Sequence, residues 1–191
     1  LSSYFTQDKL FLGGAGGSGY VTTSNPSDAT DGGGIVILFV DTLVGNGNSI
    51  LANGTTPVAV NPVGAPDGGG GGGGSVLLNV LALPDSLTVT ANGGDGQNLN
   101  TNNYHGPGGG GGGGVLLYSL PSLPAAVTFG ADGGAPGVHS DGYDNGADSG
   151  AVGGTFGLYV PIENVNYRAN IDNDPIAPVC DIDDDGDGLT D

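Results

Sequence analysis

Hydrophobic positions in this chain gather in short segments, each of which directly follows a run of glycines. Four such segments begin at positions 35, 75, 115 and 155, so their spacing is 40 residues each time. They cover 35–40, 75–78, 115–118 and 155–160. A continuous apolar run rich in Val, Ile and Leu is typical of a β-strand buried on both faces. The pattern predicts one such strand in each of four repeated units.

A second motif follows roughly sixteen residues after each of the first three starts, at 51–54, 90–94 and 130–134. The residues leading into it alternate in polarity, most clearly Leu87-Thr88-Val89-Thr90, which predicts a strand with one face in water. An Asn or Asp precedes Gly at positions 53, 92 and 132, and this pair predicts a tight turn with positive φ. Each unit is therefore expected to run strand, short connection, second strand, turn and glycine-rich return.

Glycine is the dominant residue, with 42 Gly and 12 Pro among 191 residues. Such an excess without a period would indicate disorder, and it disfavours helices. Here the runs recur near 13–19, 32–34, 68–74, 108–114 and 150–154. Seven residues of polyglycine II helix span about 22 Å, which is close to the length of a strand of six or seven residues.

We therefore expect the runs to pack side by side, held by backbone hydrogen bonds. The predicted fold is all-β, with 40-residue glycine-rich repeats of paired β-strands and a layer of polyglycine II helices. The same pattern leaves two alternatives open, mobile glycine loops over a conventional sandwich and some other arrangement.

The charge of the chain separates a body from a tail. Two basic residues against 20 acidic ones give a net charge of −18, which excludes nucleic acid as a partner. Eight aspartates fall within 172–191. We expect a glycine-rich domain over 1–166, a linker over 167–180 and the start of an acidic calcium-binding repeat over 181–191. The longest apolar run, 35–40, is far shorter than the roughly 20 residues of a membrane span, so no membrane insertion is expected. A secretion signal, if one exists, is expected outside this chain.

The tail carries a metal-binding pattern. Asp183-Asp184-Asp185-Gly186-Asp187-Gly188-Leu189-Thr190-Asp191 fits D-x-D-x-D-G-x-x-D, in which alternate acidic oxygens converge on Ca²⁺ and a Gly allows the turn. An overlapping register begins two residues earlier. The candidate ligands are Asp181, Asp183, Asp185, Asp187, Asp191 and the carbonyl of Leu189. A solvated acidic tail is the alternative interpretation.

Two resemblances follow from these patterns. The alternation of strands and glycine runs over about 10–165 resembles the polyglycine II-containing domains of some phage receptor-binding adhesins and of the extracellular region of receptors of the anaplastic lymphoma kinase type. The tail, with Asp172-Asn173-Asp174-Pro175 and Val179-Cys180-Asp181, resembles the start of a thrombospondin type 3-like array. Such arrays follow adhesive modules in secreted surface proteins of gliding and other Bacteroidota. This resemblance implies type IX secretion, further acidic repeats and a cell-surface role.

Two tripeptides, Asp41-Thr42-Leu43 and Asp85-Ser86-Leu87, look like O-glycan acceptors of the same bacterial group, which makes Thr42 and Ser86 candidate modification sites. Both are expected at the same place in the repeat, within the connection between the paired strands. Asn53-Gly54-Thr55 fits an N-glycan sequon. Cys180 has no second cysteine in the chain with which to form a disulfide.

Catalytic motifs are not recognisable, so we expect no enzymatic activity. His139-Ser140-Asp141 has the residue types of a triad, but adjacent side chains point apart. The aspartates at 141, 144 and 148 fit a solvated loop better than a cation site. The chain contains no H-E-x-x-H, C-x-x-C or G-K-[ST] sequence.

The favoured hypothesis is an extracellular adhesive or structural module on a bacterial cell surface. Loops at 20–31, 95–107 and 135–149 would meet a glycan, protein or solid surface. They carry the aromatic and imidazole side chains of Tyr20, Tyr104, His105, His139 and Tyr143. One alternative is a filament or matrix subunit that assembles through strand addition at an open repeat end. Another is ice binding, although the sequence shows no regular Thr or Ala array.

Overall fold

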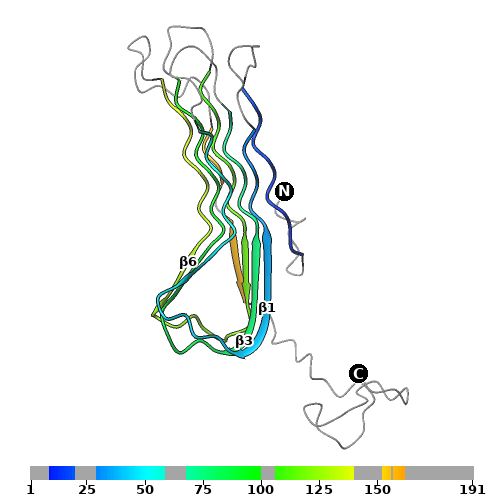
Figure 1. Ribbon diagram of the computed structural model, residues 1–191, viewed down its shortest axis with the longest axis vertical. Coiled ribbons are helices and arrows are strands. Elements are labelled where there is room, and N and C mark those ends of the chain that lie inside the picture. Colours follow the sequence, from blue (N-terminus) through cyan, green and yellow to red (C-terminus); the bar gives the residue numbers. More distant parts are fainter. Residues whose placement is uncertain are drawn as a thin grey trace, which may run out of the picture.

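The computed structural model describes residues 9–19, 29–58, 68–99, 106–139, 152–155 and 157–161. Within these residues the chain forms strands and no helix, as the sequence predicts. The strands are β1 (Ile35–Thr42), β2 (Ser49–Leu51), β3 (Ser75–Ala82), β4 (Leu87–Thr90), β5 (Val115–Tyr118), β6 (Val127–Gly130) and β7 (Leu158–Pro161). Figure 1 shows them at one end of the molecule, with long extended segments above them.

The strands form two sheets in which every pairing is parallel. The four-stranded sheet has the order β1-β3-β5-β7, and the three-stranded sheet has the order β2-β4-β6. Ile35 pairs with Ser75, and Ser75 pairs with Val115. Each of the first three passes therefore places one strand in each sheet and returns to the same level, and the next pass adds β7 to the four-stranded sheet.

Predicted and observed strand starts agree for three of the four buried strands, at Ile35, Ser75 and Val115. The fourth begins at Leu158 and not at Thr155. The delay is caused by a contact with a distant residue, because the N–H of Gly157 still donates to the carbonyl oxygen of Ala131 in the glycine-rich region.

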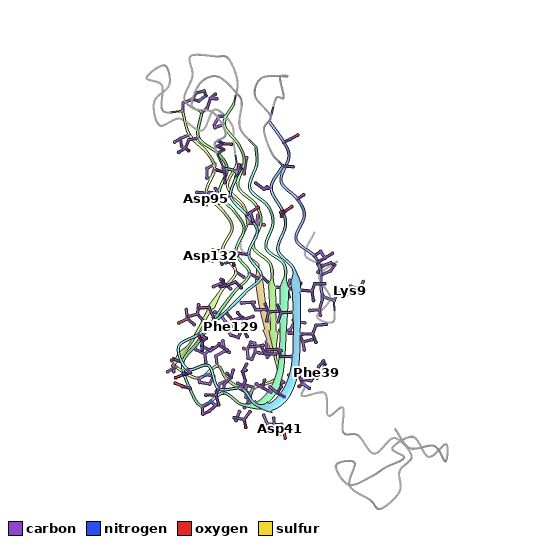
Figure 2. The ribbon with its side chains drawn as sticks, in the orientation of Figure 1. Lys9, Phe39, Asp41, Asp95, Phe129 and Asp132 are labelled. Atoms are coloured by element: carbon purple, nitrogen blue, oxygen red, sulfur yellow. The ribbon has the colours of Figure 1, made fainter. Side chains whose placement is uncertain are left out.

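The hydrophobic core lies between the two sheets (Figure 2). Alternate residues of β3 point into it, and Val76, Leu78 and Val80 are almost completely buried. From the other sheet, Leu87 and Val89 complete the same cluster. Tyr118 and Phe129 meet edge to face, with ring centroids 5.7 Å apart, and join β5 to β6. Burial on both faces holds for β5, but this prediction is wrong for β1, where exposed and half-buried residues alternate at the edge of the sheet.

The predicted tight turns after β2, β4 and β6 are wrong. Among the described non-glycine residues only Asn46 has a positive φ, at 47°. The chain instead continues straight into three extended segments, 52–58, 91–99 and 131–139, which we call the rising arms. Asn53 and Asn92 do not turn because their side chains accept hydrogen bonds from the next rising arm, at the backbone nitrogens of Asn92 (2.8 Å) and Asp132 (2.9 Å).

Candidate functional site

The region above the sheets is a layer of extended segments joined by backbone hydrogen bonds, and we call it the glycine layer (Figure 1). It contains the three rising arms and the glycine runs that lead down into the strands. Its members are 13–19, 29–34, 52–58, 68–74, 91–99, 106–114, 131–139, 152–155 and Gly157. The end of this layer that lies farthest from the sheets we call the apical end (Figure 1).

The run 68–74 shows how the layer is bonded. From Gly69 to Gly74, successive N–H groups donate in turn to the carbonyl oxygens of Gly17, Gly109, Thr55, Gly14, Gly112 and Ala52, at 2.7–3.0 Å. The neighbour that accepts thus recurs every third residue. A β-strand would alternate between two sides, with a period of two. The run therefore bonds to three surrounding segments through its donors alone.

The run 106–114 follows the same rule with different neighbours. Gly108, Gly111 and Gly114 donate to the rising arm 91–99, at the oxygens of Gln97, Gly94 and Ala91. Gly110 and Gly113 donate to Val152 and Thr155. As the donor's residue number increases, the acceptor's residue number falls by three along the rising arm and rises by three along 152–155. These two neighbours therefore run in opposite directions.

Close approach explains why these positions are glycine. A Cβ built on Gly71 would lie closer than 3.0 Å to the carbonyl oxygen of Asp31, and one on Gly111 would collide in the same way with Gly71. By contrast, Gly14 and Gly34 have no atom within 4 Å of such a Cβ. At positions such as Gly71 and Gly111 the layer has room only for backbone, whereas Gly14 and Gly34 could carry a side chain.

Polar side chains link the rising arms by a further set of hydrogen bonds that the sequence analysis missed. The arm 91–99 offers three of them, from Asn92, Asp95 and Asn98, whose Oδ1 atoms accept the N–H groups of Asp132, Ala135 and Val138 at 2.7–2.9 Å. These acceptors are three residues apart. The glycine runs have the same period, since every third N–H donates to the same neighbouring segment. The recurrence of Asn or Asp at this spacing was the available signal.

The apical end is where all the described arms and runs stop. The arms end at Val58, Leu99 and His139, and the next runs resume at Gly68, Gly106 and Val152. Parts of the predicted loops belong to the layer and not to loops, namely 29–31, 95–99, 106–107 and 135–139. Tyr20, Tyr104, His105 and Tyr143 lie outside the described residues.

His139 was expected on an exposed loop, and this prediction is wrong. Its side chain is 5% exposed, and its backbone forms a parallel bridge with Leu99, which is fully buried. His139 occupies in its arm the position that Leu99 occupies in the preceding one, so it points inward for the same reason. Its Nδ1 atom is buried and has no hydrogen-bond partner among the residues that the structure describes.

Both candidate glycosylation residues lie at the basal end, where the connections 43–48 and 83–86 join the two sheets. Thr42 and Ser86 are exposed. Their expected equivalence in the repeat is wrong, because Thr42 is the last residue of β1 and pairs with Ala82, whereas the carbonyl of Ser86 accepts the N–H of Gly47. Asn53, of the N-glycan sequon, uses its Oδ1 in the link to Asn92.

The outward face of the three-stranded sheet carries a row of hydroxyl groups. Ser49, Thr88 and Thr128 are in register across β2, β4 and β6. Ser49 and Thr128 are exposed and Thr88 is half-buried. No short sequence pattern reveals this row, because its members are separated by 39 and then 40 residues.

The candidate calcium ligands at 181–191 lie outside the described residues, as do the aspartates at 141, 144 and 148. In the part that the structure describes, no three His, Cys, Asp or Glu side chains come together as a metal site. The same part holds no helix with the length and apolarity to cross a bilayer. Comparison of the chain with family models, with curated proteins and with solved structures gave no match.

Proposed function

We propose that this chain is a non-enzymatic structural or adhesive module of a large bacterial surface protein, working outside the cell. In this proposal the glycine layer is a bundle of polyglycine II helices, built from 40-residue repeats, that carries binding segments at its apical end. The observation that carries the proposal is the three-residue period of the hydrogen bonds made by 68–74. Polyglycine II has three residues per turn and no internal hydrogen bonds, so its donors point to separate neighbours.

Such a bundle is suited to hold a binding surface rigidly. Fixing the backbone of each glycine costs about 1–2 kcal/mol, and a free heptaglycine would remain flexible. Here each run is fixed by hydrogen bonds on several sides and by contacts that leave no room for a Cβ. The connecting segments then start from a stiff base, which lowers the entropy lost when they bind a partner.

The connecting segments have the composition of a recognition surface. They contain Tyr20, Tyr104 and Tyr143 among Asn, Ser, Thr and Asp residues. Tyrosine supplies rigid contact area at low entropic cost, and the short polar side chains supply adaptable hydrogen bonds. The proposed partner is a glycan, a protein or a solid surface.

The display role can be tested by replacing 100–105 and 140–151 with Gly-Ser segments of equal length. We expect the variant to keep the amide protection of 68–74 in hydrogen exchange and to lose adhesion to host or bacterial surfaces and to glycan arrays. Retained adhesion would rule out these segments as the binding surface. Rapid exchange of the heptaglycine amides in the wild-type protein would instead contradict the proposal that the bundle is rigid.

The acidic tail is proposed to bind Ca²⁺ and to stiffen the link to following repeats. Calorimetric titration of the full chain should show binding that is lost in a variant carrying Asp183→Asn, Asp185→Asn and Asp187→Asn. A matched variant with Asp141→Asn, Asp144→Asn and Asp148→Asn should bind normally. Equal loss in both variants would indicate diffuse attraction to an acidic protein.

Filament formation at the end of the repeats is less well supported. In 131–139, the last rising arm among the described residues, the acceptor positions held by Asp95 and Asn98 in the preceding arm become Ala135 and Val138. The donor Gly96 has Pro136 as its counterpart, which has no N–H. A further unit would find few of the polar groups that join the internal arms.

Ice binding is a second candidate because of the hydroxyl row Ser49-Thr88-Thr128, which lies on a parallel sheet with strands about 4.8 Å apart. A thermal hysteresis measurement decides it. Activity that disappears in Thr88→Val with Thr128→Val would establish this function, and an inactive wild-type protein would exclude it.

A further inference from the structure

The outward face of the four-stranded sheet is unevenly covered. On the edge strand β1, Ile35, Ile37 and Phe39 are 40%, 50% and 40% exposed. On β5, Leu117 shares that face through the register with Leu77 and Ile37, and it is only 3% exposed. Leu81 of β3, on the same face, is 64% exposed as well, so the exposed apolar area reaches beyond β1. Contiguous exposed apolar area of this kind is typical of an interaction surface. Together with Asp41, the next outward position, Ile35, Ile37 and Phe39 form what we call the β1 stripe.

The stripe has opposite charges at its two ends. Asp41 lies at the basal end of β1, and Lys9 lies near its upper end, on the same side of the sheet (Figure 2). Lys9 is held there by the segment that follows it, because the Phe11 nitrogen donates to Ser75 Oγ and the Ser75 hydroxyl donates to the Phe11 oxygen, both at 2.8 Å. Ser75 in turn pairs with Ile35. Lys9 is one of two basic residues in the chain.

We infer that the β1 stripe binds the same stripe of a second copy of this chain, in a two-fold dimer with the two β1 strands antiparallel. In this arrangement Lys9 faces Asp41 of the other copy at both ends. Ile37 meets its own counterpart near the axis, and Ile35 packs against Phe39. A two-fold contact requires such self-complementarity, in which each residue and its partner exchange roles.

Charge also favours this face over the one that carries Asp95 and Asp132. With a net charge of −18, two copies repel each other unless they meet where acidic groups are few. Asp95 and Asp132 project from the opposite side of the molecule in Figure 2. The stripe therefore offers apolar area and one cation on a face remote from these two carboxylates.

The first test is sedimentation of the full chain at up to ~0.5 mM in about 0.15 M salt, where a dimer with a micromolar dissociation constant is fully formed. We expect a dimer whose dissociation constant rises about tenfold or more in Ile37→Asn. The matched control is Leu51→Asn, an exposed apolar residue (62%) on the other sheet, and it should leave the dimer unchanged. A monomeric wild-type protein overturns the inference, as does a dimer that Ile37→Asn leaves intact.

The second test addresses the orientation of the two copies. Lys9→Asp alone and Asp41→Lys alone should each weaken the dimer, and the double variant should restore it. Within one chain the two side chains are kept apart by most of β1, about 20 Å for six residues, so the rescue must occur between copies. If the double variant is as weak as the single ones, the antiparallel two-fold arrangement is wrong.

Discussion

The glycine layer and the strand region are parts of the same repeated passes of the chain, yet different interactions hold them together. Between the sheets, side chains such as Val76 and Leu78 fill the space and are removed from water. In the glycine runs, backbone donors and acceptors fill the space, and a Cβ at positions such as Gly71 or Gly111 finds no room. The two regions should therefore fail under opposite changes, the strand region when a side chain is truncated and the glycine layer when one is added.

The sharpest test of this difference is Gly71→Ala. The new methyl group collides with the carbonyl oxygen of Asp31, which cannot move without breaking hydrogen bonds of the layer. We expect the free energy of unfolding to fall by about 4 kcal/mol or more, at the upper limit of single substitutions, as measured by urea denaturation. The control is Gly14→Ala, which meets no atom within 4 Å and should change stability by about 0.5 kcal/mol or less. Equal effects at the two positions would show that the layer is loosely packed.

The reverse change is expected to matter in the strand region. Leu78→Ala removes a fully buried side chain and should cost about 3 kcal/mol in the same measurement. Leu81→Ala, on the same strand but 64% exposed, should cost less than about 1 kcal/mol. A small effect at Leu78 would mean that the space between the sheets is not a packed core.

A polar contact joins the N-terminal segment to the strand region. Ser75→Ala removes both hydrogen bonds to Phe11 from a site with no exposure and should cost about 2 kcal/mol. Hydrogen exchange should then accelerate at Phe11 and leave the amide of Leu78 protected. Ser49→Ala, at an exposed position on β2, serves as the control. Equal acceleration at both amides would indicate global unfolding in place of local release.

The side-chain links between rising arms should have the smallest effect. Asn92→Ala leaves the N–H of Asp132 without its acceptor and should cost about 1 kcal/mol, because the site is not deeply buried. Asn92→Asp keeps an oxygen at the same place, as Asp132 does in the next arm, and should retain most of the stability. Exchange of the Asp132 amide provides the measurement. Faster exchange in the aspartate variant than in the alanine variant would contradict a role as acceptor.

The strand positions were predictable because they depend on local order in the sequence. An apolar run that directly follows glycines predicts the starts of β1, β3 and β5 at Ile35, Ser75 and Val115. Only the fourth start failed, where Gly157 bonds to Ala131, a residue far away in the chain. The joining of the strands into two parallel sheets also depends on contacts some 40 residues apart, which no short window of sequence contains.

The errors at the candidate site have the same origin. Asn53-Gly54 and Asn92-Gly93 have the local signature of a turn, but the side chain of each Asn bonds to the next arm and keeps the chain extended. His139 was expected to be exposed because nothing in its neighbourhood indicates burial. Its position is set by its alignment with Leu99, and that alignment follows from the register between arms.

The absence of room for a Cβ in the glycine layer has a genetic consequence. Every single-base change in a glycine codon that alters the residue without ending translation introduces a side chain. A position such as Gly71 or Gly111 therefore has no neutral amino-acid replacement within reach of one mutation. Gly14 and Gly34, where a Cβ meets no atom within 4 Å, are free of this restriction, so replacements can accumulate at such positions while those at Gly71 and Gly111 are eliminated.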